Sequence, residues 1–227
     1  MRRLVRGRAP VTEALEITVT APIVSFRNPL YAAVQVTLPC PPPSTVAGLL
    51  ASMVGGWDAM PRGTAFAMAF TAQGQGTDVE TFHPLEAKGG RISPTPKDRE
   101  FLADATLTVW FTDHLDLWEA AVRRPVWPLR FGRSQDLASA RVRRTVLRPQ
   151  PGRQGHALVP DSASKAGTTL RLPTAISRDR ARTTWAGYRY ATSGSNYMLT
   201  TGHSTPEGQA VVLLEGVHPD LVAENAA

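Results

Sequence analysis

The 227-residue sequence predicts an α+β fold in which one antiparallel sheet carries two helices and is followed by a second, β-rich part. Three observations support this prediction. Short segments with alternating or β-branched residues recur along the chain, and two segments with apolar residues at helical spacing lie between them. Beyond residue 150 the composition shifts to Gly, Ser, Thr and Pro, which favours short strands.

The first strand is expected at 15–22 (LEITVTAP), where apolar and polar residues alternate. Residues 25–43 are expected to be extended, because prolines interrupt them repeatedly. A helix is predicted over 45–54, with Ser44 or Thr45 as its N-cap. The Gly-Gly pair directly after this segment is the expected end of the helix.

Two strands are predicted next, at 64–72 and 106–112, since both segments are rich in apolar, β-branched or aromatic residues. Residues 77–82 are expected to continue the sheet. The segment 86–104 is interpreted as a polar excursion. It contains a Gly-Gly pair suited to a hairpin tip and two prolines that exclude a central strand.

A second helix is predicted over 115–123, with Asp113 as its cap and arginines at the end where the helix dipole favours positive charge. Further strands are expected at 129–132 and 142–147. In the remaining part, the strand candidates are 156–159, 168–172, 196–200 and 210–214.

The order of these elements matches the βαββαβ arrangement of a ferredoxin-like (RRM-related) unit, which has one open sheet face. We therefore expect a ferredoxin-like domain at 13–150 and a β-rich region at 151–227 packed on it. Residues 1–12 are basic and are expected to form a flexible N-terminal segment. The sequence predicts neither a membrane span nor a secretory signal, so a cytoplasmic protein is expected.

Positive charge is concentrated in one segment of the chain. The 25 basic and 19 acidic residues give a net charge of +6. Between residues 121 and 153 there are nine arginines and one acidic residue, Asp136, so this segment carries +8 and the remainder sums to −2. A basic segment on a nearly neutral background is the pattern expected for binding a polyanion, most simply a nucleic acid.

Sequence motifs for cofactor chemistry are not found. The single cysteine, Cys40, excludes an internal disulfide and a multi-cysteine zinc site. It lies between prolines and is expected to be packed rather than nucleophilic. The sequence contains no HExxH motif, no phosphate-binding loop and no complete GxGxxG motif. Neither a metal nor another cofactor is therefore predicted.

Three motifs resemble those of one protein family. The first is SFRNP at 25–29 followed by LPCPPPSTVAGLL at 38–50, the second is FGRSQDL at 131–137, and the third is TPKDREFL at 95–102. In this arrangement the chain resembles the CRISPR-associated protein 5 family, which comprises RAMP-type subunits of type I Cascade complexes. The C-terminal third carries no comparable motif.

The resemblance implies a single-copy subunit, not a homo-oligomer, that binds the 5′ handle of the CRISPR RNA (crRNA). It also implies that this subunit caps the Cascade backbone filament, contacts the large subunit and meets target DNA only indirectly. Family members carry a hairpin thumb, for which 86–101 is the candidate here. The residues expected to contact RNA are Ser25, Arg27, Ser44, Thr45, Lys88, Arg91, Lys97, Arg99, Arg130, Arg133, Ser134, Arg141, Arg143 and Arg144.

Two of these patterns have an alternative interpretation. The prolines before Ser44 either lead into a helix start whose free N–H groups bind an anion, or simply form a good helix start. Gly132 permits a turn in which backbone approaches a ligand, with Arg133 and Ser134 placed to donate to phosphate oxygens. The alternative for Arg133 is a salt bridge to Asp136.

Some relatives in one subtype cut precursor RNA with a tyrosine and an adjacent Lys-His pair. Here Tyr31 stands near the expected tyrosine position, but no Lys-His dipeptide occurs. His83, with an acidic residue and a lysine nearby, is the remaining histidine candidate. We therefore expect a non-catalytic subunit. The alternatives are a metal-independent endoribonuclease using Tyr31 and His83, and an unrelated basic RNA-binding protein.

Aromatic residues accompany the basic ones in two places. Trp127 and Phe131 lie within the basic segment, where they either stack on RNA bases or belong to the core. A second aromatic–basic cluster comprises Trp185, Tyr188, Tyr190, Arg182 and Arg189. This cluster either binds RNA or faces a neighbouring subunit.

Overall fold

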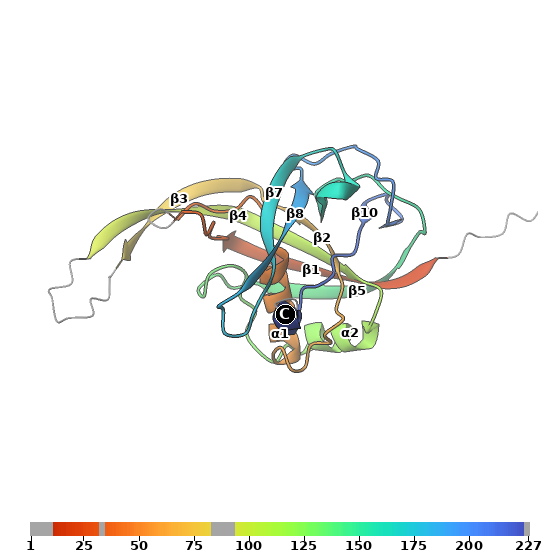
Figure 1. The fold of residues 1–227 in the computed structure, drawn as a ribbon, viewed down its shortest axis with the longest axis horizontal. Helices are drawn as coiled ribbons and strands as arrows, with labels where there is room; N and C mark the ends of the chain where they lie inside the picture. The colour runs from red at the N-terminus through yellow and green to blue at the C-terminus, as the bar shows by residue number, and fades with distance from the viewer. Residues whose placement is uncertain (1–10, 32–34, 83–93, 225–227) are drawn as a thin grey trace, which may run out of the picture.

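A computed structural model describes residues 11–31, 35–82 and 94–224 (Figure 1). Its strands are β1 (Thr12–Val24), β2 (Ala67–Thr71), β3 (Gly74–Phe82), β4 (Thr95–Phe111), β5 (Ser139–Leu147), β6 (Ala157–Pro160), β7 (Thr168–Ile176), β8 (Thr183–Tyr190), β9 (His203–Ser204) and β10 (Ala210–Val211). The helices are α1 (Pro43–Val54), α2 (Leu115–Arg123), α3 (Asp220–Glu224) and the 3₁₀ turn η1 (Asp161–Ala163). None of the helices in these ranges is long and apolar enough to cross a membrane.

Eight strands form one antiparallel sheet in the order β5-β1-β4-β2-β6-β8-β7, with β3 paired to β4 beside this path. The predicted antiparallel sheet is therefore confirmed. Strands from the last third of the chain continue the same sheet, because β6 pairs with β2 through Leu158 and Met68. Thr12 already belongs to β1, whereas residues 1–10 lie outside the described residues.

The two faces of the sheet differ because side chains alternate along each strand. In β1, Leu15, Ile17 and Val19 are fully buried in the main core, which the helices α1 and α2 complete. On the opposite face, Val211 of β10 packs on Trp110 and covers one end of the sheet. We call the uncovered remainder of that face the open face; it comprises Thr18, Thr20, Thr106, Thr108, Ser139 and Arg141.

Helix α1 begins at Pro43, with Pro42 as its N-cap, so the prediction of Ser44 or Thr45 as the cap is wrong. Proline suits the first helical position because its fixed φ matches the helix and no N–H partner is needed there. The N–H of Thr45 donates to the Pro42 carbonyl at 3.0 Å. The helix ends as predicted, at Gly55 with a φ of 101°.

Helix α2 has the predicted bounds, but its N-cap is His114 and not Asp113. His114 has a φ of 52°, and no side chain caps the helix. Trp118, Ala121 and Val122 form its buried side. The amphipathic spacing therefore determined this helix without help from a cap.

Two predicted strands do not form. At 129–132 the backbone turns back instead, and the N–H of Phe131 donates to the carbonyl of Asp136 at 2.9 Å. At 196–200 the backbone is irregular apart from an isolated bridge at Met198. Conversely, β8 was not predicted, because its sequence (TTWAGYRY) mixes small, polar and aromatic residues without a clear period.

β3 and β4 form a long hairpin that projects from the body of the molecule (Figure 1). The interpretation of 86–104 as a polar excursion is wrong for its second half, which belongs to β4. Residues 83–93 lie outside the described residues. Pro96 is tolerated because it lies opposite Thr81 in the two-stranded part of the hairpin, where a central strand is not interrupted.

Cys40 is fully buried, which confirms the expected packing. Burial raises the pKa of its thiol far above the ordinary value, because the thiolate would lose its hydration. We expect the folded protein to resist iodoacetamide at mildly alkaline pH and to react only as fast as it unfolds. Mass spectrometry with and without urea checks this expectation. Rapid alkylation in the absence of urea would contradict it.

Candidate nucleic-acid interface

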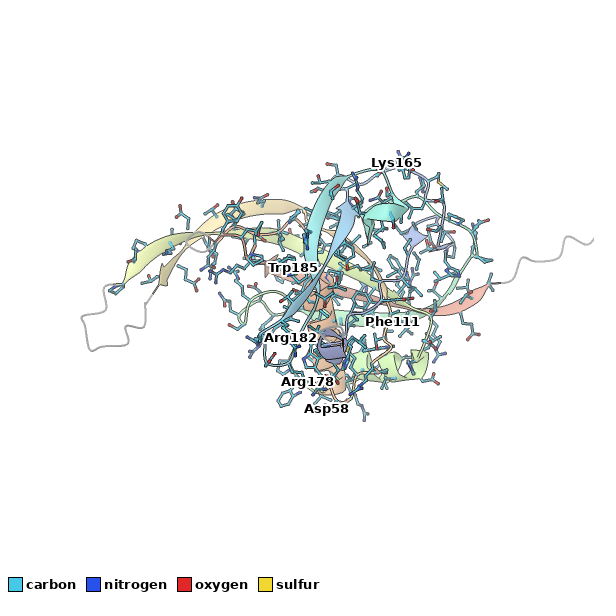
Figure 2. All side chains as sticks on the ribbon, in the orientation of Figure 1. Asp58, Phe111, Lys165, Arg178, Arg182 and Trp185 are labelled. Carbon is cyan, nitrogen blue, oxygen red and sulfur yellow. The ribbon has the colours of Figure 1, made fainter. Side chains whose placement is uncertain are left out.

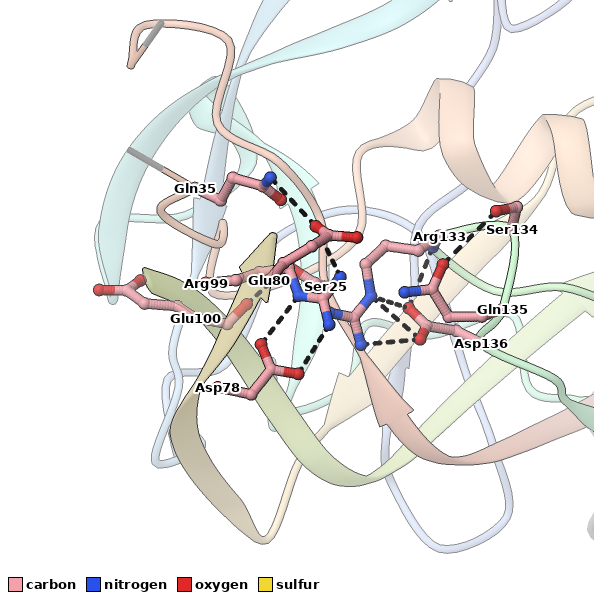
Figure 3. Close-up of polar contacts among 10 residues, drawn as sticks. All are labelled: Ser25, Gln35, Asp78, Glu80, Arg99, Glu100, Arg133, Ser134, Gln135 and Asp136. Carbon is pink, nitrogen blue, oxygen red and sulfur yellow. Dashed lines mark hydrogen bonds and ion pairs between the residues drawn. The ribbon is translucent and has the colours of Figure 1, made fainter. Parts of the chain in front are cut away.

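The three sequence motifs meet at the base of the β3–β4 hairpin, which we call the motif junction (Figure 3). The Ser25 hydroxyl donates to the Glu100 carbonyl at 2.7 Å, and the N–H of Thr37 donates to the Glu100 carboxylate at 3.0 Å. The rings of Phe26 and Phe131 pack edge to face, with centroids 5.0 Å apart. Motifs that are distant in the sequence are thus joined by direct contacts.

Gly132 lets the FGRSQDL motif turn against the end of β1. Its φ is 107°, and a Cβ atom there would lie 2.8 Å from the carbonyl oxygen of Ser25. A residue without a Cβ atom is therefore required both by the backbone conformation and by the available space. The close approach expected at Gly132 is found, and its partner is the protein's own backbone.

Arg133 is turned inward onto Asp136. Its Nε and Nη2 donate to the carboxylate at 2.8 to 3.0 Å, and its backbone N–H donates at 3.0 Å. The Asp136 side chain is 3% exposed, and Nη1 of Arg133 is buried without a hydrogen-bond partner among the described residues. The salt-bridge alternative is thus the one observed. In this structure the guanidinium stabilises the turn, and its contact with RNA stays a prediction.

Arg99 anchors the hairpin in a similar way (Figure 3). Its guanidinium donates to both carboxylate oxygens of Asp78 at 2.8 and 2.7 Å, and Nη1 lies 2.8 Å from the carboxylate of Glu80. The Gln35 amide donates to the same Glu80 carboxylate at 3.3 Å. The hydrogen bonds from Arg99 hold the pKa of Asp78 below its ordinary range. Sequence reasoning missed both acids, because alternation along β3 does not reveal which strand pairs with it.

The alternation of β5 divides the basic segment between the two faces of the sheet. Arg143 lies on the side of the open face and donates to Glu16 at 2.7 and 3.0 Å. Arg144 lies on the helix side, where it contacts Glu119 at 2.7 Å and also Asp116. The Glu119 carboxylate accepts hydrogen bonds from Arg144 and from Arg123, and these bonds lower its pKa, with the larger effect from Arg144. Two arginines that the sequence grouped together therefore face opposite sides of the sheet.

Arg141 stands at the edge of the open face. Its side chain is exposed, and no acidic group of the described residues lies within salt-bridge distance of it. A hollow of about 470 Å³ beside it is lined by Glu16, Thr18, Arg141, Val142 and Arg143. The hydroxyls of Thr20 and Ser139 hydrogen-bond at 2.9 Å on the same face. Hydroxyls and a guanidinium without aromatic platforms suit a sugar–phosphate chain better than stacked bases.

The other predicted contacts are spread over several elements. Arg27, Arg130 and Ser134 are exposed, and Ser44, Thr45 and Lys97 are partly exposed. Lys88, Arg91 and His83 lie outside the described residues. Tyr31 is 48% exposed, and its N–H donates to the Asn28 carbonyl at 3.3 Å. Across the described ranges, no three His, Cys, Asp or Glu side chains are grouped to hold a metal ion.

The aromatic residues divide between core and surface. Phe131 is fully buried, whereas Trp127 is 57% exposed. Tyr188 and Tyr190 are buried, whereas Trp185 is 36% exposed. The core interpretation therefore holds for Phe131 and not for Trp127. In the second cluster, Trp185 is the aromatic ring exposed to other molecules, because both tyrosines are buried.

Several solved structures have a similar fold. A chain of a "CRISPR RNA-guided surveillance complex" has a TM-score of 0.51 at 14% identity, covering 80% of this chain and 90% of that chain. A chain of the Type III-B Cmr-beta complex bound to cognate target RNA and AMPPnP has a TM-score of 0.52 at 10% identity, covering 81% and 86%. A CRISPR protein from Archaeoglobus fulgidus has a TM-score of 0.50 at 12% identity, covering 88% and 99%. At these identities the likeness concerns the fold.

No curated protein matches the sequence at a significant level. A family model described as CRISPR-associated protein (Cas_Cas5) matches residues 14–208, a range that contains all three motifs. The resemblance noted in the sequence is thereby confirmed over most of the chain. The chain belongs to the CRISPR-associated Cas5 family.

Proposed function

We propose that this protein is the subunit of a type I Cascade complex that binds the 5′ handle of crRNA without cutting it. As a single copy in the cytoplasm, it caps the backbone filament, contacts the large subunit and meets target DNA only through the assembled complex. Membership of the Cas5 family and the fold shared with a chain of a CRISPR RNA-guided surveillance complex support this proposal. The family match also removes the alternative of an unrelated RNA-binding protein.

The fold inference follows from the sheet order. The strands β5-β1-β4-β2 are antiparallel and carry α1 and α2 on one face. Together with the element order β1, α1, β2, β4, α2, β5, this arrangement supports a ferredoxin-like unit at 13–150. The β3–β4 hairpin is then an insertion in this unit, and we propose that it serves as the thumb beside the guide RNA.

The observation that carries the proposal is the gathering of the three motifs at the motif junction (Figure 3). Its buried members, such as Ser25, Arg99 and Arg133, are bonded within the protein and fix the hairpin relative to the sheet. On the same motifs, Arg27 and Ser134 are exposed to solvent. We infer that the motif junction serves two purposes. Its buried side chains fix the position of the hairpin relative to the sheet, and its exposed side chains bind RNA.

The RNA contact is tested by removing a single exposed guanidinium. For Arg141→Ala we expect about fivefold weaker binding of a CRISPR repeat RNA, and a slope of log affinity against log salt that falls by about one. The reason is that, within the described ranges, no carboxylate pairs with Arg141, so its removal breaks no ion pair there and is expected to affect phosphate binding. Fluorescence anisotropy over a salt series measures both quantities. Lys165→Ala, which removes another exposed cation, is the matched control. Unchanged affinity and slope in Arg141→Ala would contradict binding on the open face.

Absence of catalysis is tested with the same RNA in EDTA. We expect no discrete cleavage, since the sequence lacks the Lys-His pair that cutting relatives use. Tyr31 is nevertheless exposed, so its role is directly testable. Specific cleavage that is lost in Tyr31→Phe or His83→Ala would replace our proposal by the endoribonuclease alternative.

A further inference from the structure

β7 forms one edge of the large sheet. It stands last in the strand order and pairs with β8 on one side. Among the described residues, no backbone hydrogen bond joins the other side of 168–173 to another segment. A strand edge with unpaired N–H and C=O groups is a template for an additional strand. Pro173, which lacks an N–H, and the register shift between Pro173 and Ala175 limit pairing toward the end of β7, so the accessible edge is 168–172.

An apolar hollow of about 360 Å³ runs along this edge. It is lined by Asn28, Pro29, Leu30, Leu38, Thr169, Leu170, Arg171, Leu172, Pro173 and Trp185. Five consecutive residues of β7 form one wall, and residues 28–30 and Leu38 contribute to the other. Leu30 is 85% exposed and Trp185 is 36% exposed, so large apolar side chains stand open to solvent at the hollow. Such a concentration of apolar surface beside an unpaired edge indicates an interaction site.

The position of Trp185 and Arg171 gives the hollow a chemical preference (Figure 2 labels Trp185). Trp185 lies opposite Pro173 in the register, and Arg171 lies opposite Gly187, so both side chains belong to the outer face of the β7–β8 pair. Arg171 is exposed, and no acidic side chain of the described residues lies within salt-bridge distance of it. Tryptophan and arginine are the residue types that contribute most to protein interfaces.

We propose that an extended segment of a partner protein adds as a strand to the edge of β7. A bulky apolar side chain of that segment fills the hollow beside Trp185, and an acidic side chain pairs with Arg171. A peptide fits better than RNA, because the hollow is lined mainly by aliphatic residues and proline and holds a single cation, whereas a phosphate chain requires several. This surface goes beyond the RNA-binding role, and it accounts for the exposed tryptophan of the second aromatic–basic cluster.

Random twelve-residue peptides displayed on phage, selected against the full-length protein, provide the probe. We expect the enriched peptides to share a bulky apolar residue and an acidic residue on one side of an extended segment. A synthetic copy of such a peptide is expected to bind Trp185→Ala at least about tenfold more weakly. Arg171→Glu is expected to weaken it as well, and exchanging the peptide's acid for lysine is expected to restore binding. Trp127→Ala and Arg124→Glu are the matched controls, since they remove an exposed tryptophan and an exposed arginine elsewhere.

Addition of a strand is distinguished from simple pocket binding by its backbone hydrogen bonds. Methylating alternate backbone nitrogens of the peptide is expected to abolish binding, and hydrogen exchange of β7 amides is expected to slow in the complex. The proposal fails if no peptide is enriched, or if Trp185→Ala and Arg171→Glu both bind the peptide as tightly as the unmodified protein does. It also fails if a single-stranded RNA competes with the peptide for binding. Trp185→Ala and Arg171→Glu are expected to keep their affinity for repeat RNA. A failure of the peptide experiment would therefore leave the proposed RNA-binding role intact.

Discussion

Replacing Gly132 with alanine is expected to destabilise the protein by about 3 kcal/mol or more, because backbone strain and a steric clash act together. The residue has a φ of 107°, which side chains with a Cβ atom rarely adopt. The added methyl group would also lie 2.8 Å from the carbonyl oxygen and 3.1 Å from the nitrogen of Ser25. These are backbone atoms of the residue that directly follows β1, so they cannot move aside without shifting the end of that strand. Urea unfolding measures the loss of stability.

Gly56→Ala is the matched control for this prediction. Gly56 has a φ of 128°, but nothing lies within 4 Å of the position that a Cβ atom would take. Its substitution is therefore expected to cost only the conformational strain, about 1–2 kcal/mol. Binding of repeat RNA is expected to weaken in Gly132→Ala and to be unchanged in Gly56→Ala. Equal losses of stability in the two variants would show that contact with Ser25 is unimportant.

The second large effect is expected at Arg99. Arg99→Met keeps much of the aliphatic stem but removes the hydrogen bonds to Asp78 and Glu80, and we expect a loss of about 2 kcal/mol. Arg144→Met is the control, because Arg144 also pairs with two carboxylates but its side chain is 49% exposed, compared with 10% for Arg99. Exposed pairs contribute little, so a much smaller loss is expected there. Urea unfolding at neutral pH gives both values.

The pH dependence of this effect has a definite sign. Arg99 lowers the pKa of Asp78 in the folded protein, so the stabilisation is complete above the ordinary carboxyl pKa, about 3.9, and is lost as pH falls through the folded value. The difference in stability between the unmodified protein and Arg99→Met is therefore expected to be constant near neutrality and to shrink in acid. A difference that grows as the pH falls below the ordinary carboxyl pKa would contradict an anchoring role for Asp78. Hydrogen exchange in β3 is expected to accelerate in Arg99→Met, because the hairpin loses its anchor.

Local pattern was sufficient wherever one segment determined its own structure. Alternation in β1 identified the strand and its buried side, and the spacing of α2 gave both of its bounds. Gly55 ended α1 where the Gly-Gly pair indicated. The caps were predicted less well: proline replaced Ser44 at the start of α1, and His114 replaced Asp113 before α2. Several backbone arrangements can begin a helix, so the presence of a capping side chain does not specify which one is used.

The candidate site was predictable in its motifs and not in its contacts. The three motifs were recognisable, and their clustering at one hairpin base gives that resemblance a physical form. The arginines, however, were expected to be cations available to phosphate. Arg99, Arg133 and Arg143 are instead bonded to carboxylates. In the case of Arg143, the partner Glu16 is 127 positions away in the sequence.

The amino-acid sequence by itself determined the family, the two main helices, the buried cysteine and the inward and outward sides of β1. These properties depend on the period of a strand or helix and on short motifs, which are local. Tertiary structure alone decided which carboxylates meet Arg99, Arg143 and Arg144, and that neighbouring Arg143 and Arg144 face opposite sides of the sheet. It also left β7 at the edge of the sheet. The physical reason is that ion pairs and strand edges depend on the order in which strands lie side by side, and that order is determined by packing of the whole chain.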